Sequence, residues 1–176
     1  MSEWFEDMLT GGHPNSLGRT IEVVDMVLAN PDRFEELFRC YQSADEVVRL
    51  RTSNAMKRVE KEKHALLVPY IDQFIEEIGK LDQASAQWTL AQLFEVLTKD
   101  MDDAQIERAK VIVKRNLSNH EDWIVLKTSA KTLTLWAKND DDLRAWLEPH
   151  LKRLAVDERK TVSGQAKKSL KALGFE

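Results

Sequence analysis

The four histidines and the carboxylates beside them would carry any metal or acid–base chemistry, and their spacing favours a structural role. His13, His64, His120 and His150 form no HExxH motif, so no zinc-ligand cluster is visible. His120 and Glu121 form one pair, whereas a metal site needs several converging ligands. We therefore interpret this pair as turn residues before a helix, and we expect no metal, no cofactor and no catalytic residue.

Two aspartate clusters could bind a cation, since carboxylates are the ligands that hard cations prefer. Neither has EF-hand spacing, and each precedes a predicted helix, so we interpret them as N-caps that also complement the helix dipole. The clusters are Asp100, Asp102 and Asp103, and Asp140, Asp141 and Asp142.

Cys40 is the single cysteine, which excludes a disulfide within the chain and favours a reducing compartment. No histidine is expected near it, so we predict a buried thiol in the core rather than a nucleophile.

The N-terminus MSEWFEDMLT lacks a basic flank and a long apolar stretch, and no apolar run approaches the length of a membrane helix. We therefore expect a cytoplasmic protein that does not insert into a membrane.

The composition is that of a folded helical chain. Hydrophobic residues make up 43% of the 176 residues and charged residues 32%, while 6 glycines and 4 prolines leave little material for turns. The formal net charge of −4 argues against an indiscriminate nucleic-acid binder.

Apolar residues recur at a period of 37 or 38 residues. One such column is Phe34, Ile71, Ala109 and Leu147, and a second is Phe38, Ile75, Val113 and Leu151. A period near 40 built from helices is typical of α-solenoids, in which helical pairs bury their apolar faces against their neighbours. No strand-like alternation is present, so we predict an all-α fold.

The helices that would form these pairs can be placed along the chain. The first helix of each pair, which we name A, is expected over 31–43, 66–82, 103–118 and 140–155. The second, B, is expected over 45–63, 83–99, 121–138 and 158–173, opening at Asp45, Gln83, Glu121 and Glu158. Pro149 indicates either a kink in the fourth A helix or a later helix start near that proline.

The N-terminal segment stands apart from the repeats. Residues 1–16 form either a helix that caps the end of the solenoid or a mobile arm, and residues 17–176 form the solenoid domain. Asn15 or Ser16 would cap a helix that contains Ile21, Val24 and Leu28 and ends before Pro31.

These pairs resemble HEAT repeats and their armadillo relatives. The segment LVPYIDQFIEEI resembles the first helix of such a repeat, and the segment DEVVRLRTSNAMKRV resembles the second. The best local match to the repeat pattern is formed by Asp45, Val47, Val48 and Arg49. Later repeats lack the arginine. The resemblance implies a right-handed superhelix of about four HEAT-like hairpins, with the B helices lining its concave side.

Charge separates between the two sets of helices. The B spans sum to +7 and the A spans to −3. If the B helices line the concave side, that surface is basic and attracts an acidic peptide, phosphate groups or nucleic acid. Trp88 is a candidate apolar anchor at the edge of its helix face. The partner-binding candidates are Arg49, Arg51, Lys57, Trp88, Lys127, Lys131 and Lys167.

We hypothesise a non-catalytic scaffold that binds a protein or acidic partner through the B helices. The alternative is a DNA-binding protein or glycosylase similar to HEAT-like alkylation-repair enzymes, in which Trp123 and Lys127 would match an aromatic-basic helix. The acidic net charge and the absence of an arginine-rich helix argue against it. A HEAT protein that handles a tetrapyrrole-carrying partner has no support beyond the fold. The oligomeric state is left open.

Overall fold

The computed structural model describes residues 3–175, and it is built from helices without a strand in that range. The all-α prediction is therefore confirmed. The helices are α1 (Phe5–Leu9), α2 (Thr20–Ala29), α3 (Phe34–Arg39), α4 (Glu46–Glu62), α5 (Ile71–Glu76), α6 (Ala84–Leu97), α7 (Asp103–Asn119), α8 (Trp123–Ala137), α9 (Asp141–Leu154) and α10 (Lys160–Ala172).

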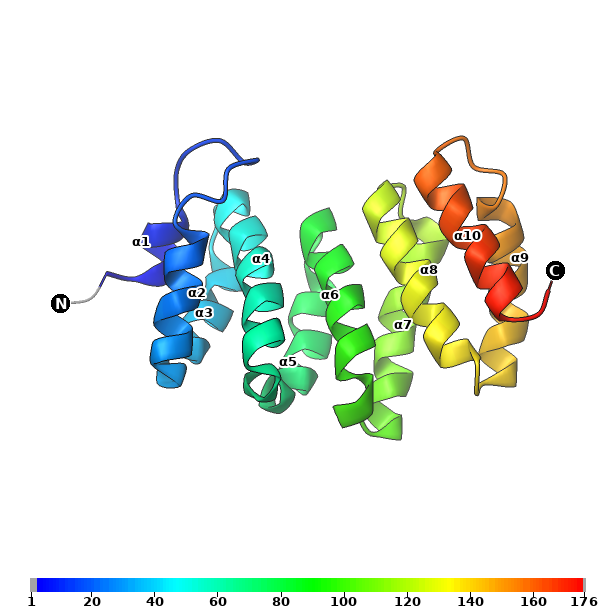
Figure 1. The fold of residues 1–176 in the computed structure, drawn as a ribbon, viewed down its shortest axis with the longest axis horizontal. Helices are drawn as coiled ribbons and strands as arrows, with labels where there is room; N and C mark the ends of the chain where they lie inside the picture. Colours follow the sequence, from blue (N-terminus) through cyan, green and yellow to red (C-terminus); the bar gives the residue numbers. More distant parts are fainter. Residues whose placement is uncertain (1–2, 176) are drawn as a thin grey trace. The chain divides into compact units, whose positions relative to one another are not determined.

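The chain divides into two compact units, one ending at Thr89 and the other beginning at Leu90, so the division falls within α6. In the N-terminal unit, α2 and α4 lie in front of α3 and α5 in the view of Figure 1. In the C-terminal unit, α8 and α10 lie in front of α7 and α9. Each unit is thus a two-layer packing of helices, with its core between the layers.

The four predicted B helices are confirmed as α4, α6, α8 and α10, each within two residues of its expected limits. Two capping residues differ from expectation. The side chain of Asp122, not Glu121, accepts from the first backbone amides of α8, and α10 begins after Arg159 without a side-chain cap. Asp45 caps α4 as expected, since its carboxylate accepts from Val47 N at 2.8 Å.

The first two A helices are shorter than predicted. Helices α3 and α5 have six residues each, and short 3-10 turns flank them. Pro31 and Pro69 lie at the beginning of two of these turns, where the fixed φ of proline is tolerated. The third and fourth A helices, α7 and α9, agree with their predicted limits to within one residue.

Two expectations about helix starts are wrong. Helix α2 does not begin after Asn15 or Ser16, because Gly18 has a φ of +53°, a conformation that an α-helix cannot contain. Helix α9 runs through Pro149 from Asp141 to Leu154, so the alternative of a start near that proline is also wrong.

The N-terminal helix α1 packs against α2, α3 and α4, and its Phe5, Met8 and Leu9 are buried. The Arg33 guanidinium lies 3.9 Å from the centre of the Phe5 ring. The boundary expected between residues 16 and 17 stays a prediction.

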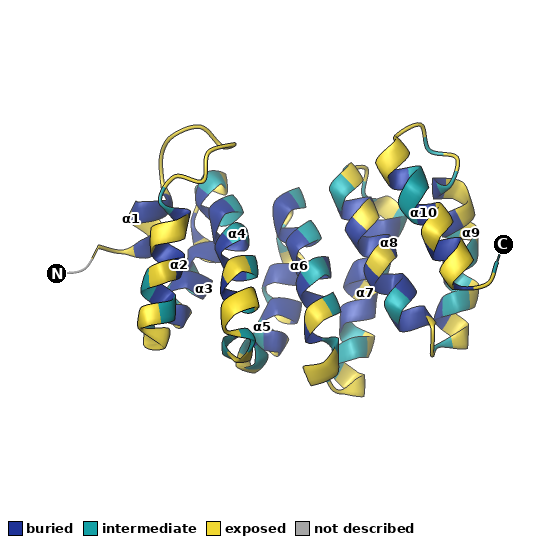
Figure 2. Cartoon of the chain, in the orientation of Figure 1, coloured by how far each residue is buried: buried dark blue, intermediate teal, exposed yellow. Residues whose placement is uncertain are grey.

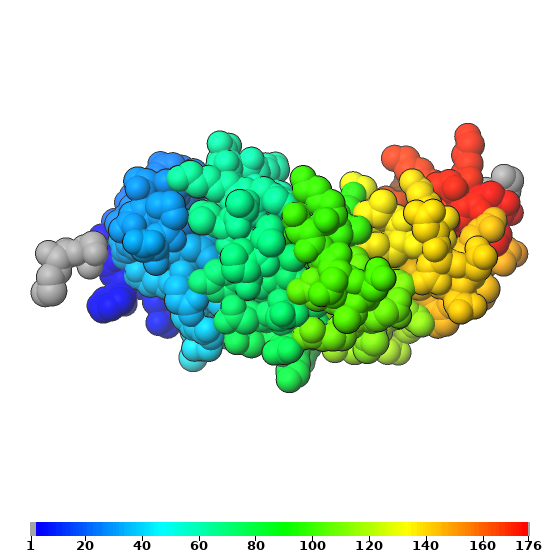
Figure 3. All heavy atoms as spheres, turned by 90° about the horizontal axis from the view of Figure 1, so that it is seen from below, coloured from blue at the N-terminus to red at the C-terminus, as the bar shows by residue number. Residues whose placement is uncertain are grey.

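In the C-terminal unit, α8 is the central helix. It packs against α7, α9 and α10, and most of its ribbon is buried in Figure 2. The space-filling view of Figure 3 shows the yellow to red atoms of α8, α9 and α10 against one another. This central helix positions the surface described next.

Candidate partner-binding surface

Helix α8 leaves one exposed strip on an otherwise buried helix. Its core residues include Val125, Leu126 and Leu133, whereas Lys127 and Lys131 are exposed and lie one turn apart. Trp123, 44% exposed, begins the same strip one turn before Lys127. Residues spaced by four share a face of a helix, so these three side chains point the same way.

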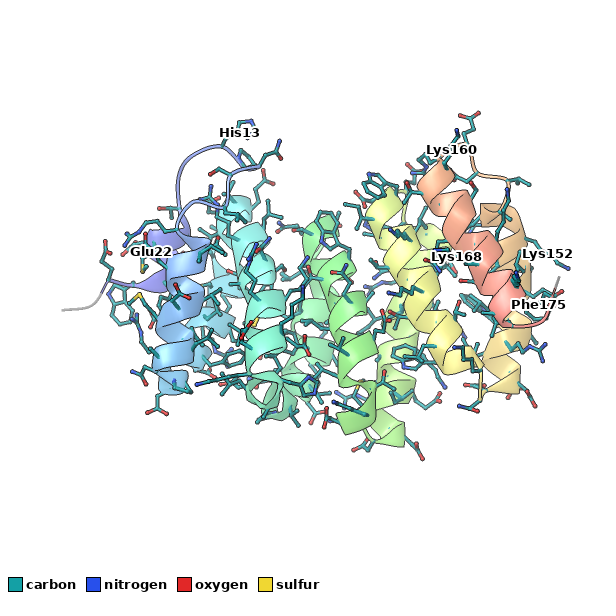
Figure 4. The ribbon with its side chains drawn as sticks, viewed as in Figure 1. His13, Glu22, Lys152, Lys160, Lys168 and Phe175 are labelled. Atoms are coloured by element: carbon teal, nitrogen blue, oxygen red, sulfur yellow. The ribbon has the colours of Figure 1, made fainter. Side chains whose placement is uncertain are left out.

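Helix α10 lies beside α8 and exposes a lysine-rich side. Its buried residues are Val162, Ala166, Ser169 and Leu170. The lysines lie on the opposite side of the helix and are all exposed; Figure 4 labels Lys160 at the start of the helix and Lys168 farther along. The α10 lysines are Lys160, Lys167, Lys168 and Lys171.

We name the exposed lysines of α8 and α10 the basic face: Lys127, Lys131, Lys160, Lys167, Lys168 and Lys171. Neither helix contains an aspartate or a glutamate. Among the described residues, the ion pair between Lys131 Nζ and Glu95 Oε1 at 3.5 Å is the single one made by this face. The face is therefore a concentration of positive charge on a chain whose net charge is negative.

The basic face lowers the stability of its own helices. Lys127 and Lys131, and likewise Lys167 and Lys171, are like-charged pairs four residues apart, each of which destabilises a helix by about 0.2–0.5 kcal/mol. Lys160 adds a cation in the first turn of α10, where the helix dipole disfavours positive charge. Lys171, in the last turn of α10, is favoured by the same dipole.

Arg51 does not belong to such a surface. It is 2% exposed, and its guanidinium donates to the backbone carbonyls of Leu9, Gly11, His13 and Ser16 at 2.6–3.2 Å. The side chain holds the loop between α1 and α2, so it is not available to a partner.

Arg49 is half-buried, and its guanidinium donates to Gln83 Oε1 at 2.6 Å and to the Ser43 carbonyl at 2.7 Å. It therefore links α4 to the start of α6 within the N-terminal unit. Trp88, on α6, is half-buried.

Lys57 is half-buried on α4, and burial, followed by repulsion from Lys61 and Arg58, lowers the pKa of its ammonium. Of the predicted binding residues, Lys127 and Lys131 lie on the exposed strip of α8, and Lys167 is exposed on α10, which packs against α8.

The residues considered for chemistry make local contacts or are buried in the part of the chain that the structure describes. Cys40 is buried, as predicted, and burial raises the pKa of its thiol to about 12. Asp102 forms a capping box with Gln105, and Asp140 caps α9 through Leu143 N. His120 Nδ1 accepts from Asp122 N at 3.1 Å in the turn before α8.

Within residues 3–175, no group of three or more His, Cys, Asp or Glu side chains is placed to hold a metal ion. None of the helices in this range is long and apolar enough to cross a membrane.

One recessed surface of the C-terminal unit was not predicted from the sequence. A groove lies between the A helices α7 and α9, with Lys114 and Trp146 in its lining. Charge totals over the A helices do not reveal it, because the three acidic and three basic side chains of its lining cancel. The signal that could have found it is Trp146, a half-buried aromatic residue outside the stripe of buried leucines of α9.

The chain matches no protein-family model, no curated protein and no solved structure.

Proposed function

We propose that this protein is a non-catalytic helical-repeat scaffold that binds an acidic protein or peptide through the basic face of α8 and α10. The observation that carries the proposal is the set of six exposed lysines on two adjacent helices that contain no carboxylate. Uncompensated charge of one sign steers an oppositely charged partner and selects against partners of like charge. Trp123 would add apolar contact area at the edge of this face.

The same proposal includes the finer architecture, a right-handed superhelix of HEAT-like hairpins. It is supported by the apolar columns near a 38-residue period and by the packing of α7 on α8 and of α9 on α10. A reducing, cytoplasmic location is also part of the proposal, and the buried free thiol of Cys40 supports it.

The proposal is tested with a fluorescently labelled polyglutamate peptide as the acidic probe and the full chain as the receptor. Reversing two charges in K127E/K131E should weaken binding about tenfold or more at low salt, because two attractive contacts become repulsive. The variant should also reduce the slope of log affinity against log salt concentration.

The matched control is K80E/K99E, which changes the net charge equally at two exposed lysines outside the basic face. Its affinity should fall much less. Equal losses in both variants would show that only total charge matters, and an unchanged affinity in K127E/K131E would reject the proposed surface.

Duplex DNA is a second candidate partner, because Trp123 and Lys127 lie one turn apart on the exposed strip of α8. Aromatic and basic side chains together are a common means of binding nucleic acid. Gel-shift titrations of duplex DNA at low and moderate salt separate this candidate from an acidic protein.

A further inference from the structure

The groove between α7 and α9 is a second recessed surface of the C-terminal unit. It is open to solvent and has a volume of about 540 Å³, within the range of ligand pockets. Its lining comes from α7 and from the start and middle of α9: Glu107, Lys110, Val111, Lys114, Arg115, Ser118, Asp140, Asp142, Leu143 and Trp146.

The middle of the groove is apolar. Val111 is 69% exposed on α7, a large exposure for an aliphatic residue in the middle of a helix. Leu143 forms part of the wall, and Trp146 is half-buried with its ring stacked at 4.2 Å on His150. The exposed Val111 side chain provides an apolar surface beside Trp146 that an apolar side chain of a ligand can cover.

The charges at the two ends of the groove differ in their pairing. At the end near the helix starts, the Lys110 ammonium donates to both Glu107 and Asp140, so these charges compensate one another. At the other end, Lys114 Nζ lies 4.6 Å from the centre of the Trp146 ring. Among the described residues, neither this ammonium nor the Trp146 indole N–H has a carboxylate or carbonyl partner.

The Lys114 ammonium and the apolar side chain of Val111 indicate which ligand the groove would accept. An anionic oxygen would accept a charge-assisted hydrogen bond from Lys114 Nζ, and such bonds are the strong kind. A neighbouring apolar group would cover Val111. The acidic end of the groove, with Asp142 exposed there, disfavours a second negative charge of the ligand at that end.

We propose that the groove between α7 and α9 binds a linear segment of a partner protein in which one acidic side chain is next to an aromatic or branched apolar side chain. The open groove follows two helices, which suits a chain segment better than an enclosed small molecule. This site uses residues outside the basic face, so it does not rest on the function proposed above.

The probe is an array of acetylated tetrapeptides that pair one Asp or Glu with one Phe, Trp, Leu or Ile in either order. Matched peptides replace the acid by its amide, or the apolar residue by alanine. Binding to the full chain is followed by the ¹H–¹⁵N cross-peak of the Trp146 indole, which is assigned by its loss in Trp146→Phe. We expect the acidic-apolar peptides to shift this cross-peak, and the amide and alanine versions to bind about tenfold more weakly.

Variants of the protein provide the second arm. Lys114→Gln should weaken the best peptide about tenfold, whereas Lys152→Gln, on the exposed part of α9, should leave it unchanged. K127E/K131E should also leave it unchanged, which separates this site from the basic face. Equal binding of acid and amide peptides, or the lack of any peptide that shifts the Trp146 cross-peak, would overturn the proposal. Phenylacetate binding as tightly as the best peptide would show a small-molecule site instead.

Discussion

At the scale of single residues, Arg51 illustrates how burial changes the role of a charged side chain. A buried charge without a counter-ion is costly unless hydrogen bonds satisfy it, and here four backbone carbonyls do so. Gly18 allows the close approach, since a Cβ there would lie 3.0 Å from the guanidinium. The arginine therefore fixes the course of the loop between α1 and α2.

Arg51→Ala should lower the free energy of unfolding by about 3 kcal/mol, because it leaves the loop carbonyls without their charged donor. Arg51→Lys should recover only part of the loss, since an ammonium lacks the planar fork of donors. Chemical denaturation measures the stability, and hydrogen exchange should show faster exchange in residues 10–18.

The control for this prediction is Arg58→Ala on the same helix. Arg58 is exposed, and its guanidinium donates to Asn54 Oδ1 at 2.6 Å. The change should stay within about 0.5 kcal/mol. A similarly small effect of Arg51→Ala would contradict the role assigned to the buried guanidinium.

His150 gives the folded protein a pH dependence. Burial, together with the nearby charges of Arg153 and Lys114, lowers the pKa of its imidazole below the ordinary value of 6.5. Between the two pKa values the unfolded chain binds more protons than the folded one, so stability falls as the pH falls through this window.

Thermal unfolding from about pH 7 to about pH 5 should therefore show a steeper loss of stability in the wild type than in His150→Phe, which keeps a ring against Trp146 but cannot titrate. Parallel curves for the two proteins would contradict this contribution of His150.

At the scale of elements, the N-caps determine where the B helices begin. The Asp122 carboxylate accepts from Ile124 N at 2.8 Å and from Val125 N at 3.1 Å. Asp122→Ala should therefore destabilise the protein by about 1 kcal/mol, measured by denaturant unfolding. Glu121→Ala, one residue earlier and exposed, should have an effect within about 0.5 kcal/mol. The reverse order of the two losses would restore Glu121 as the residue that begins α8.

The B helices could be predicted because long apolar periodicity survives in each of them, as in α4 and α8. The first two A helices could not, since the 3-10 turns around α3 and α5 depend on prolines and on local packing that periodicity does not report. The burial of Arg51 could not be predicted from the sequence either, because its hydrogen-bond acceptors are backbone carbonyls 35 to 42 positions away in the chain. Exposed lysines such as Lys127 and Lys131 could be predicted, since they interrupt an apolar pattern at a spacing of four.

At the scale of the whole molecule, charge is distributed unevenly. The chain carries a formal net charge of −4, yet α8 and α10 together carry six lysines and no acid. A distant acidic partner is repelled by the net charge, so attraction must come from the local field within about a Debye length of the basic face. Binding should therefore depend on this face and decline with salt.

Lysine footprinting tests the proposed binding face most directly. The protein is labelled at its surface lysines with and without the polyglutamate probe, and mass spectrometry gives the change at each site. We predict protection of Lys127, Lys131, Lys167 and Lys168, with Lys80 and Lys99 unchanged. Uniform protection, or protection centred on lysines outside α8 and α10, would contradict the proposal.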